Sequence, residues 1–530
     1  MEPRPTRLRG LRYTELDQRK KEIRLMILDQ GEAESEIMCR LIHATLSEHP
    51  RYKALSYSWD VVKVLYPIDV DGYGFGVGPN LKAALQSIRH PSEPRYLWVD
   101  AICINQKDIA ERNYQVTIMH GIYHQAVQVI VWLGKKSFDS DSAMDVLEDD
   151  EIRERENLFP TVDRGAVVIY TSADMTTWKA LGHFFSRTWW ERVWVVQEVV
   201  WAADVIIMCG TREMSWNSLL HGSLHLQQAG ATSNNITINT VLGLAHSSFV
   251  IQMAEIRRKR IDALPLSLER VLAMARIRRS TDPRDKIFGI LNLLPLDEWP
   301  CSPDYSKSIV RVFSEVAKRI IEGSGNLTLL SACEHPWLPI GQEDHIRKPF
   351  KHPEVRNLPS WTPNWRAARI SIPLYGGCDS ISIPIKTVED TCSRFAASGT
   401  TAAEFSFSEN MTTLNVRGSI IDVVKVSTGP LVTTQIDTYG SRLYKRLERV
   451  AFDEKPMTSV YFGNMSRLEA FCRALVLDHP RYGNSLESRV LKEHATVDSS
   501  SVLQKDTWAL VHTEQRQETS SVVFMGVMCQ

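Results

Sequence analysis

The segment 185–203 carries a single acidic side chain, Glu198, in a helical run of large apolar residues. On a helix, the positions three and four residues away are all apolar: Trp194, Val195, Trp201 and Ala202. A carboxylate buried there without a partner would cost several kcal/mol of folding free energy. Glu198 therefore needs solvent at a cleft, a proton or a tertiary partner. Two interpretations stay open: an active-site carboxylate, or half of a buried ion pair with Arg112, Arg187 or Arg192.

Three other patterns that often carry chemistry give weaker signals. The glycine-rich stretch 71–79 lacks the Gly-Lys-Ser/Thr ending of a phosphate-binding loop, and its glycines fall inside a hairpin pattern. His120 and His124 are one helical turn apart, but the adjoining helical positions supply no carboxylate as a further metal ligand. No Gly-x-Ser-x-Gly elbow of a serine hydrolase is present. The sequence predicts no metal site, and Glu198 is the more informative candidate.

The elements that must position Glu198 follow an alternating order. Apolar runs predict buried strands at 52–57, 96–102, 127–134 and 204–210. A helix capped by Asn80 is expected at 81–89, and a second helix is expected to begin after its cap at Asp108. A hairpin is expected at 64–77. Alternation of strand and helix predicts a parallel sheet with helices on both faces, which is the α/β class.

The patterns divide the chain into five segments. We expect an N-terminal extension over 1–50, with one strand at 23–28, and an α/β domain over 51–225. A helical region over 226–335 and a proline-rich connection over 336–359 follow. The last segment, 360–530, is expected to be a mixed α/β C-terminal region, with strand-like spacing at 412–427 and helical spacing near 466–477.

The composition favours a globular cytoplasmic protein. The net charge of −1 predicts no affinity for nucleic acid, and the basic runs at 257–260 and 276–280 are expected on solvated helix faces. Nine scattered cysteines and an N-terminus without an apolar core argue against a disulfide framework and a secretory signal. The most apolar stretch, 193–210, is interrupted by polar residues, so no membrane span is predicted.

Three long blocks resemble the fungal heterokaryon-incompatibility (HET) domain. They are YKALSYSWD at 52–60, the stretch 97–134 that begins LWVDAICINQKD, and RTWWERVWVVQEVVWAADVIIMCG at 187–210. The resemblance continues through STDPRDKIFGILNLL to LPSWTPNW at 358–365, and Asp60 departs from the glycine usual in the family. It implies a role in nonself recognition between fungal cells and in the programmed cell death that follows fusion of unlike hyphae.

A more distant resemblance concerns chemistry. HET domains are similar to Toll/interleukin-receptor (TIR) domains, which have a flavodoxin-like parallel sheet. SYSWD at 56–60 resembles the first strand motif of that fold, and WVVQE at 194–198 resembles the W-x-x-x-E helix motif. In TIR enzymes that hydrolyse NAD this motif carries the catalytic glutamate. The resemblance implies Glu198 as the catalytic residue and NAD as the candidate substrate, with no cofactor firmly implied.

The expected binding residues leave two neighbouring strands at their carboxyl ends, where open α/β sheets bind ligands. They are Ser56, Tyr57, Trp59, Asp100, Asn105 and Gln106, together with Trp194 beside the catalytic helix. Aromatic rings there could stack on nicotinamide or adenine, and a carboxylate near the ribose would stabilise an oxocarbenium-like transition state. Each of these side chains also has a structural interpretation, in packing, capping or a turn.

Three functions are consistent with the sequence. The leading one is a HET-domain effector of incompatibility and cell death that hydrolyses the nicotinamide–ribose bond of NAD. The alternatives are a TIR-like assembly module without catalysis and an accessory enzyme of a secondary-metabolite pathway. The expected partners are further copies of the chain, through the TIR-like domain, and an incompatibility partner protein.

Overall fold

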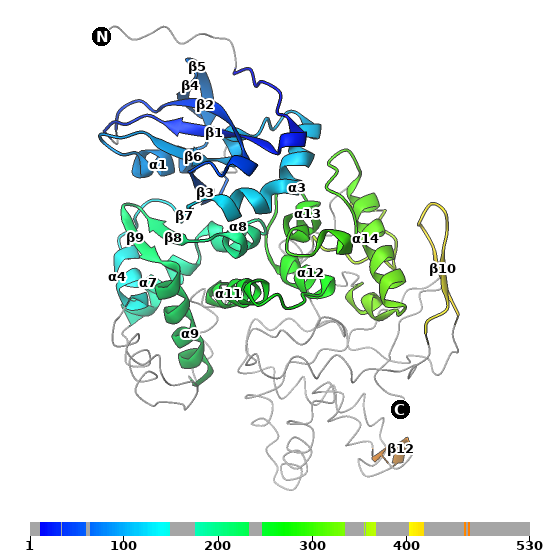
Figure 1. The fold of residues 1–530 in the computed structure, drawn as a ribbon. Helices are drawn as coiled ribbons and strands as arrows, with labels where there is room; N and C mark the ends of the chain where they lie inside the picture. Colours follow the sequence, from blue (N-terminus) through cyan, green and yellow to red (C-terminus); the bar gives the residue numbers. More distant parts are fainter. Residues whose placement is uncertain are drawn as a thin grey trace. The chain divides into compact units, whose positions relative to one another are not determined.

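The computed structural model describes residues 11–32, 34–59, 64–148, 175–232, 246–333, 355, 357–366, 402–417, 460–462 and 465–466. The chain divides into two compact units, 1–307 and 308–530. The first unit contains a nine-stranded sheet and most of the described helices (Figure 1).

The centre of the sheet is parallel, as predicted. Strands β6 (Arg95–Trp98), β3 (Lys53–Tyr57), β7 (Gln128–Trp132) and β8 (Val205–Cys209) are neighbours in that order, and all three pairs are parallel. Numbered along the chain, the order is 2-1-3-4, as in flavodoxin-like sheets. The α/β class is therefore confirmed.

Further strands extend this centre on both sides, and all their pairings except that of β2 with β4 are antiparallel, so the whole sheet is mixed. On one side lie β1 (Glu22–Leu28), β2 (Met38–Thr45), β4 (Tyr66–Val70) and β5 (Tyr73–Val77). On the other side β9 (Arg212–Ser215) pairs with β8. Two of these strands come from the segment expected to be an N-terminal extension: β1 pairs with β6, and β2 pairs with both β1 and β4.

Helices cover both faces of the parallel centre. The connection from β3 to β6 contains the β4–β5 hairpin and then helix α1 (Pro79–Ile88). The short α2 (Asp100–Cys103) and the longer α3 (Ile109–Gln125) connect β6 to β7, on the opposite side of β3. Because such crossovers are right-handed and these two run in opposite directions, α1 and α3 lie on opposite faces. Asp108 caps α3 as predicted, accepting from the amides of Ala110 and Glu111.

The second predicted cap is wrong. Helix α1 begins at Pro79 after Gly78, and Asn80 lies inside it. Proline suits the first helical position because its missing N–H needs no partner there. The amide of Asn80 instead donates to the Ser58 carbonyl and accepts from the Trp132 indole, so it joins the ends of β3 and β7.

The glycine-rich stretch forms the predicted hairpin, from β4 to β5. Its turn residues Asp71 and Gly72 have φ of 55° and 80°. Two consecutive positive φ values are typical of a type I′ turn, which favours Asp-Gly. The other glycines of the stretch therefore lie in and after a strand, without the loop that would cradle a phosphate.

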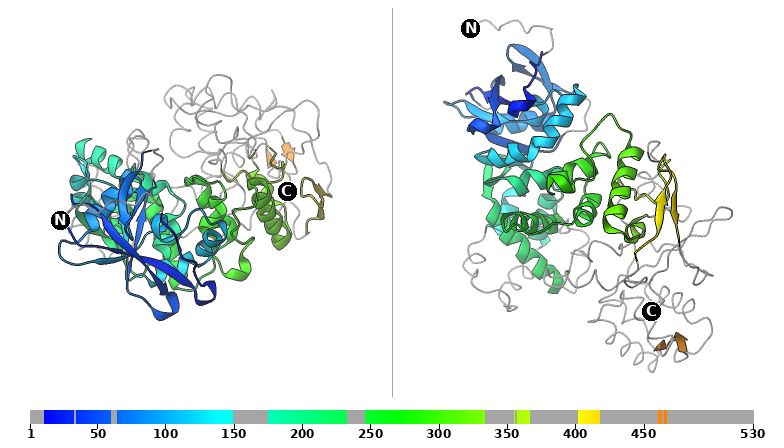
Figure 2. Two further views of the ribbon diagram at one scale, coloured as in Figure 1. Left: turned by 90° about the horizontal axis from the view of Figure 1, so that it is seen from above. Right: turned by 45° about the vertical axis from the view of Figure 1, so that its right-hand side comes forward.

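The first unit has seven further described α-helices, of which the first three lie between β7 and β8 in the chain and the other four follow β9. They are α4 (Ser140–Leu147), α7 (Met175–Phe185), α8 (Val195–Trp201), α9 (Trp216–Thr232), α11 (Ser247–Ile261), α12 (Leu268–Ile277) and α13 (Asp285–Leu291). Figure 1 shows α8 between the sheet and helices α11 to α13. In the right-hand view of Figure 2 the blue N-terminal strands lie at one end of this unit and the green helices at the other.

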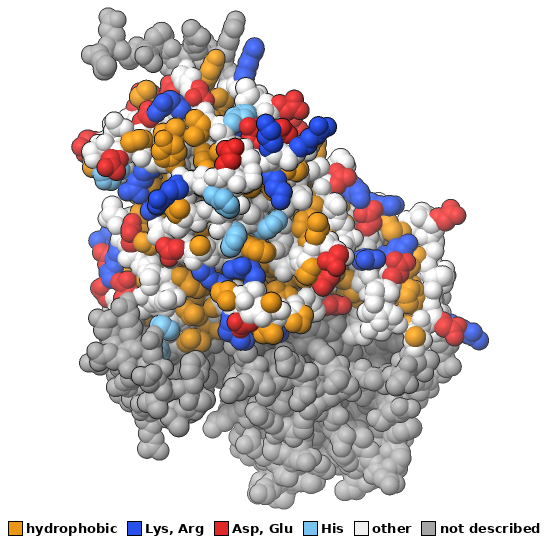
Figure 3. All heavy atoms as spheres, viewed as in Figure 1, with side chains coloured by type: hydrophobic (Ala, Val, Ile, Leu, Met, Phe, Trp, Pro, Cys, Tyr) orange, Lys and Arg blue, Asp and Glu red, His pale blue; other side chains and the backbone are white. Residues whose placement is uncertain are grey.

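The basic runs are more buried than predicted. Arg257 and Arg260 donate to carbonyls at the end of α8, and Arg276 and Arg278 are almost completely buried. The prediction of solvated faces is wrong for Arg276 and Arg278, whereas Arg257 and Arg260 are half-buried. Figure 3 shows positive and negative side chains interspersed over the visible face of the described residues.

The second unit contains α14 (Ile309–Ser324) and two small hairpins, β10 (Phe405–Phe407) with β11 (Leu414–Val416) and β12 (Val460–Phe462) with β13 (Met465–Ser466). Strand β11 lies in the predicted strand-like stretch, whose remainder from 418 is outside the described residues, as is most of the predicted helix near 466–477. Among the helices that the structure describes, none is long and apolar enough to cross a membrane.

Candidate active site

Glu198 lies at the carboxyl end of the central strand β3. Its side chain is 2% exposed, and its Oε2 accepts a hydrogen bond from the Ser56 hydroxyl. The Trp189 indole donates to the same hydroxyl oxygen at 2.8 Å. Ser56 thus joins the helix that carries Glu198 to the strand, and it satisfies two buried polar groups at once.

Burial controls the protonation of Glu198. It raises the pKa of the carboxyl from 4.5 to about 7, helped by the nearby Asp100 charge and opposed by Arg192 and the Ser56 hydrogen bond. Within the described part of the chain, Glu198 has no ion pair. Of the three arginines considered from sequence, Arg192 acts on it electrostatically, Arg187 binds backbone carbonyls and Arg112 stacks on Tyr305.

Asp100 forms the open side of the site. It follows β6 at the start of α2 and accepts from the Trp59 indole at 2.9 Å and from the Ala101 amide at 2.7 Å. Burial raises the pKa of Asp100, whereas Arg192 and a hydrogen bond with Tyr57 lower it. Trp59 is 44% exposed, so the site meets solvent here.

The structure brings together four of the expected binding residues with Glu198: Ser56, Tyr57, Trp59 and Asp100. Gln106 borders them, because its amide donates to the Asp100 carbonyl at 3.0 Å. Asn105 does not join them through its side chain, which accepts from the Lys107 amide and organises the loop after α2.

Trp194 binds elsewhere. Its side chain hydrogen-bonds to Asp285 on α13, a buried carboxyl that also accepts from the Tyr305 hydroxyl at 2.6 Å. Burial raises the pKa of Asp285 to about 6, against these two hydrogen bonds. Glu198 and Trp194, which belong to one sequence motif, therefore have different partners.

Sequence reasoning missed two residues of the site. The sequence predicts Trp189 only as apolar surface and Arg192 only as a possible ion-pair partner of Glu198. A buried indole N–H needs an acceptor, so a tryptophan close in sequence to an unexplained buried carboxylate was the available signal. For Arg192, whose Nη1 donates to the Tyr57 carbonyl, no sequence pattern marks the contact.

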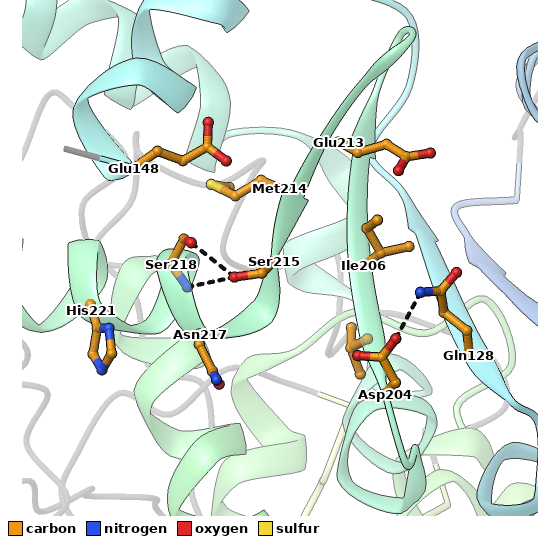
Figure 4. A pocket seen from close by; sticks show the side chains of 11 residues that line it. Gln128, Glu148, Asp204, Ile206, Glu213, Met214, Ser215, Asn217, Ser218 and His221 are labelled. Carbon is orange, nitrogen blue, oxygen red and sulfur yellow. Dashed lines mark hydrogen bonds between the residues drawn. The ribbon is translucent and has the colours of Figure 1, made fainter. Parts of the chain in front are cut away.

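A separate open pocket lies at the opposite edge of the sheet. Figure 4 shows residues from the amino ends of β7 and β8, from β9 and from α9 around it. Two of its carboxylates already have partners: Glu148 pairs with Arg212 at 2.7 Å, and Asp204 accepts from Gln128 at 2.7 Å. None of the expected site residues lines this pocket.

The histidine pair also has other partners. Nδ1 of His120 lies 2.9 Å from the Asn292 amide oxygen, and Nδ1 of His124 lies 3.2 Å from the Trp201 carbonyl. Over the described ranges, no three His, Cys, Asp or Glu side chains cluster as metal ligands would.

Comparison with known proteins gives the family of this site. Residues 52–198, from the start of β3 to Glu198, match the family model described as "Heterokaryon incompatibility protein (HET)". These residues form a HET domain. Ser56, Asp100 and Glu198 all lie within it, whereas Asp285 and the helices α11 to α13 lie outside.

The HET-domain chain is also similar to a curated protein, "Heterokaryon incompatibility protein 6, OR allele" of Neurospora crassa. The two are 28% identical over 391 residues, which are 62% of this chain and 55% of that protein. The chain thus spans about half the length of the relative. No solved structure was found to match it.

Proposed function

We propose that this HET-domain protein acts in fungal heterokaryon incompatibility, in nonself recognition and the cell death that follows fusion of unlike cells. The HET domain and the similarity to an incompatibility protein support this role. As its chemical basis we propose hydrolysis of the nicotinamide–ribose bond of NAD, with Glu198 as the catalytic carboxylate.

One observation carries the chemical proposal: Glu198 meets Ser56 at the carboxyl end of the first parallel strand, with Asp100 from the next strand close by. Ligands of flavodoxin-like sheets bind at this edge. In the proposed reaction the C1′–nitrogen bond breaks and nicotinamide leaves with the bonding electrons. Water then adds to C1′ and loses a proton, which gives ADP-ribose.

Glu198 contributes by its negative charge. A carboxylate beside the ribose stabilises the oxocarbenium-like transition state, and the low polarity of its surroundings strengthens that attraction. Arg192 and Ser56 both favour the ionised form. In this proposal Trp59, which is exposed, contacts a base, and its hydrogen-bond partner Asp100 contacts the ribose hydroxyls.

A specific observation favours a second function, assembly without catalysis. The Glu198 side chain is nearly inaccessible and already hydrogen-bonded, as a purely structural residue would be. In that case the domain would act through surfaces such as the loop 103–108, whose Lys107 side chain is exposed. Further copies of the chain or an incompatibility partner would bind there.

Expression in a fungal host separates the two functions. We expect the wild-type chain to deplete NAD and reduce viability, and Glu198→Gln to do neither. Glu255→Gln is the matched control, because that carboxylate is 13% exposed and hydrogen-bonded to Arg270 but lies on α11. If Glu198→Gln kills cells as the wild type does, while Lys107→Glu does not, assembly without catalysis is the function.

A further inference from the structure

Residues 187–192 (RTWWER), here called the strap, lie between α7 and α8, the two helices labelled in Figure 1, and contact the strand ends at the candidate site. A short 3-10 turn, Thr188–Glu191, lies between Arg187 and Arg192, both of which have extended backbones. The 3-10 turn is therefore flanked by one extended residue at each end.

The inner side of the strap binds the carboxyl ends of β3 and β7. Arg187 donates to the carbonyls of Leu133 and Lys135 after β7, at 3.1 and 3.0 Å. On β3, Thr188 donates to the Ser58 hydroxyl at 3.0 Å, Trp189 donates to Ser56, and Arg192 donates to the Tyr57 carbonyl. In a sheet of this order the gap between these two strands is the topological switch point, where ligands bind.

The outer side of the strap is held by the segment after α12. Glu191 pairs with Arg279 at 2.8 Å, and the backbones of Arg192 and Arg279 form a β-bridge. His246 is also near, with its Nε2 3.8 Å from the Glu191 carboxylate. We call the ion pair between Glu191 and Arg279 the latch. The Arg279 side chain is 77% exposed, so a binding partner can reach the latch from solvent.

Beneath the latch, the closed strap leaves a buried cation incompletely paired. Nη1 of Arg278 donates to the Trp190 carbonyl at 3.1 Å, but its Nε and Nη2 have no hydrogen-bond partner among the described residues. A buried donor without an acceptor costs free energy. The guanidinium also stacks on the Phe249 ring at 4.3 Å, and the strap's own Trp189 and Trp190 are fully buried, so the closed arrangement is held both at its surface and by packing underneath.

We propose that the strap 187–192 is an autoinhibitory cover that must leave the ends of β3 and β7 before a substrate can reach Glu198. This inference rests on the proposed function, and it explains how a catalytic carboxylate can be 2% exposed. Release of the latch between Glu191 and Arg279 opens the cover. In this movement the backbone rotates at the extended residues Arg187 and Arg192, and α7 and α8 stay in place.

A reversible crosslink tests the cover. The hydroxyl oxygens of Ser58 and Thr188 are 3.0 Å apart, so cysteines at these positions can form a disulfide. We expect the double variant Ser58→Cys/Thr188→Cys to release nicotinamide from NAD when reduced, to stop when oxidised, and to resume after dithiothreitol. Thr188→Cys alone, treated with the same oxidant, controls for the native cysteines. Equal turnover by the oxidised and reduced forms would overturn the proposal.

Hydrogen exchange gives a readout that needs no turnover. Arg279→Ala and Glu191→Gln should speed amide exchange across 187–193. Arg258→Ala should not, because it removes a comparable surface ion pair, to Asp262, away from the strap. If the latch variants exchange faster but no form releases nicotinamide, the result contradicts NAD hydrolysis and still supports an opening strap. Exchange unchanged in both latch variants would refute the strap.

Discussion

At the scale of the residue, the buried carboxyl of Glu198 makes folding depend on pH. Its pKa is raised by burial from 4.5 to about 7. The unfolded chain therefore loses this proton at lower pH than the folded chain. The stabilisation from the proton is complete below pH 4.5 and is lost as the pH rises towards 7.

Glutamine mimics the protonated side chain without titrating, so Glu198→Gln isolates this effect. We expect the variant to gain stability relative to the wild type between pH 5 and pH 8, by on the order of 3 kcal/mol at most. Urea unfolding of both proteins at the two pH values measures the difference. A difference that does not change with pH would contradict the raised pKa.

Ser56→Ala removes the hydroxyl shared by Glu198 and Trp189. Two buried polar groups then lack a partner, and we expect a loss of about 1–3 kcal/mol in the free energy of unfolding. The loss of a hydrogen bond that favours the carboxylate should also move the pH profile of nicotinamide release to higher pH. Ser58→Ala, two residues along the strand, should leave the midpoint of that profile in place.

The burial of Glu198 was predictable, whereas its partner was not. Apolar residues at helical spacing around it place the side chain in a core. Ser56 is 142 residues away in sequence, and no local periodicity encodes which strand end meets which helix. The resemblance to TIR enzymes placed Trp194 in the same site. In the structure the Trp194 indole instead hydrogen-bonds to Asp285. Asp285 belongs to neither of the two motifs, at 56–60 and 194–198, that carry the resemblance to TIR domains.

At the scale of the element, α13 holds α8 through contacts that the sequence did not suggest. Asn292, just after α13, donates to the Gln197 amide oxygen at 3.0 Å and to the Val116 carbonyl at 2.9 Å. Its own carbonyl accepts from the Trp201 indole at 2.9 Å. With Trp194 bound to Asp285, both ends of α8 are fixed from outside the HET domain.

Asn292→Ala should therefore loosen α8 without changing the contacts of the Glu198 carboxyl. We expect a loss of about 1–3 kcal/mol in stability, since Gln197 and the Val116 carbonyl lose a buried donor. Nicotinamide release should fall while its pH midpoint stays near that of the wild type. Asn292→Asp, which keeps an acceptor for His120 but no donor, should behave like alanine in the unfolding measurement. Wild-type stability in both variants would show that α13 does not hold α8.

The parallel order was predictable because strand and helix alternate, and this alternation leaves few topologies. The antiparallel additions were not, because pairing between β1 and β6 joins segments with no shared local pattern. The cap at Asp108 was correct and the cap at Asn80 was not. In the second case a proline one residue earlier starts the helix and frees the amide to join two strands.

At the scale of the whole molecule, the proposed autoinhibition requires a trigger. We expect assembly of further copies, or binding of an incompatibility partner, to compete for the exposed Arg279 and to release the strap. The net charge of −1 gives no general attraction between copies, so specific surfaces must provide it. The rate of nicotinamide release should then rise more than linearly with protein concentration.

The most direct measurement is release of nicotinamide from NAD by the purified chain over a series of protein concentrations, beside Glu198→Gln and Glu255→Gln. We expect release per chain to rise with concentration in the wild type and in Glu255→Gln, and to fall by roughly 100-fold or more in Glu198→Gln. Release should also increase with pH around 7, as Glu198 ionises. No release at any concentration, or equal release by Glu198→Gln, would contradict a catalytic role for this carboxylate.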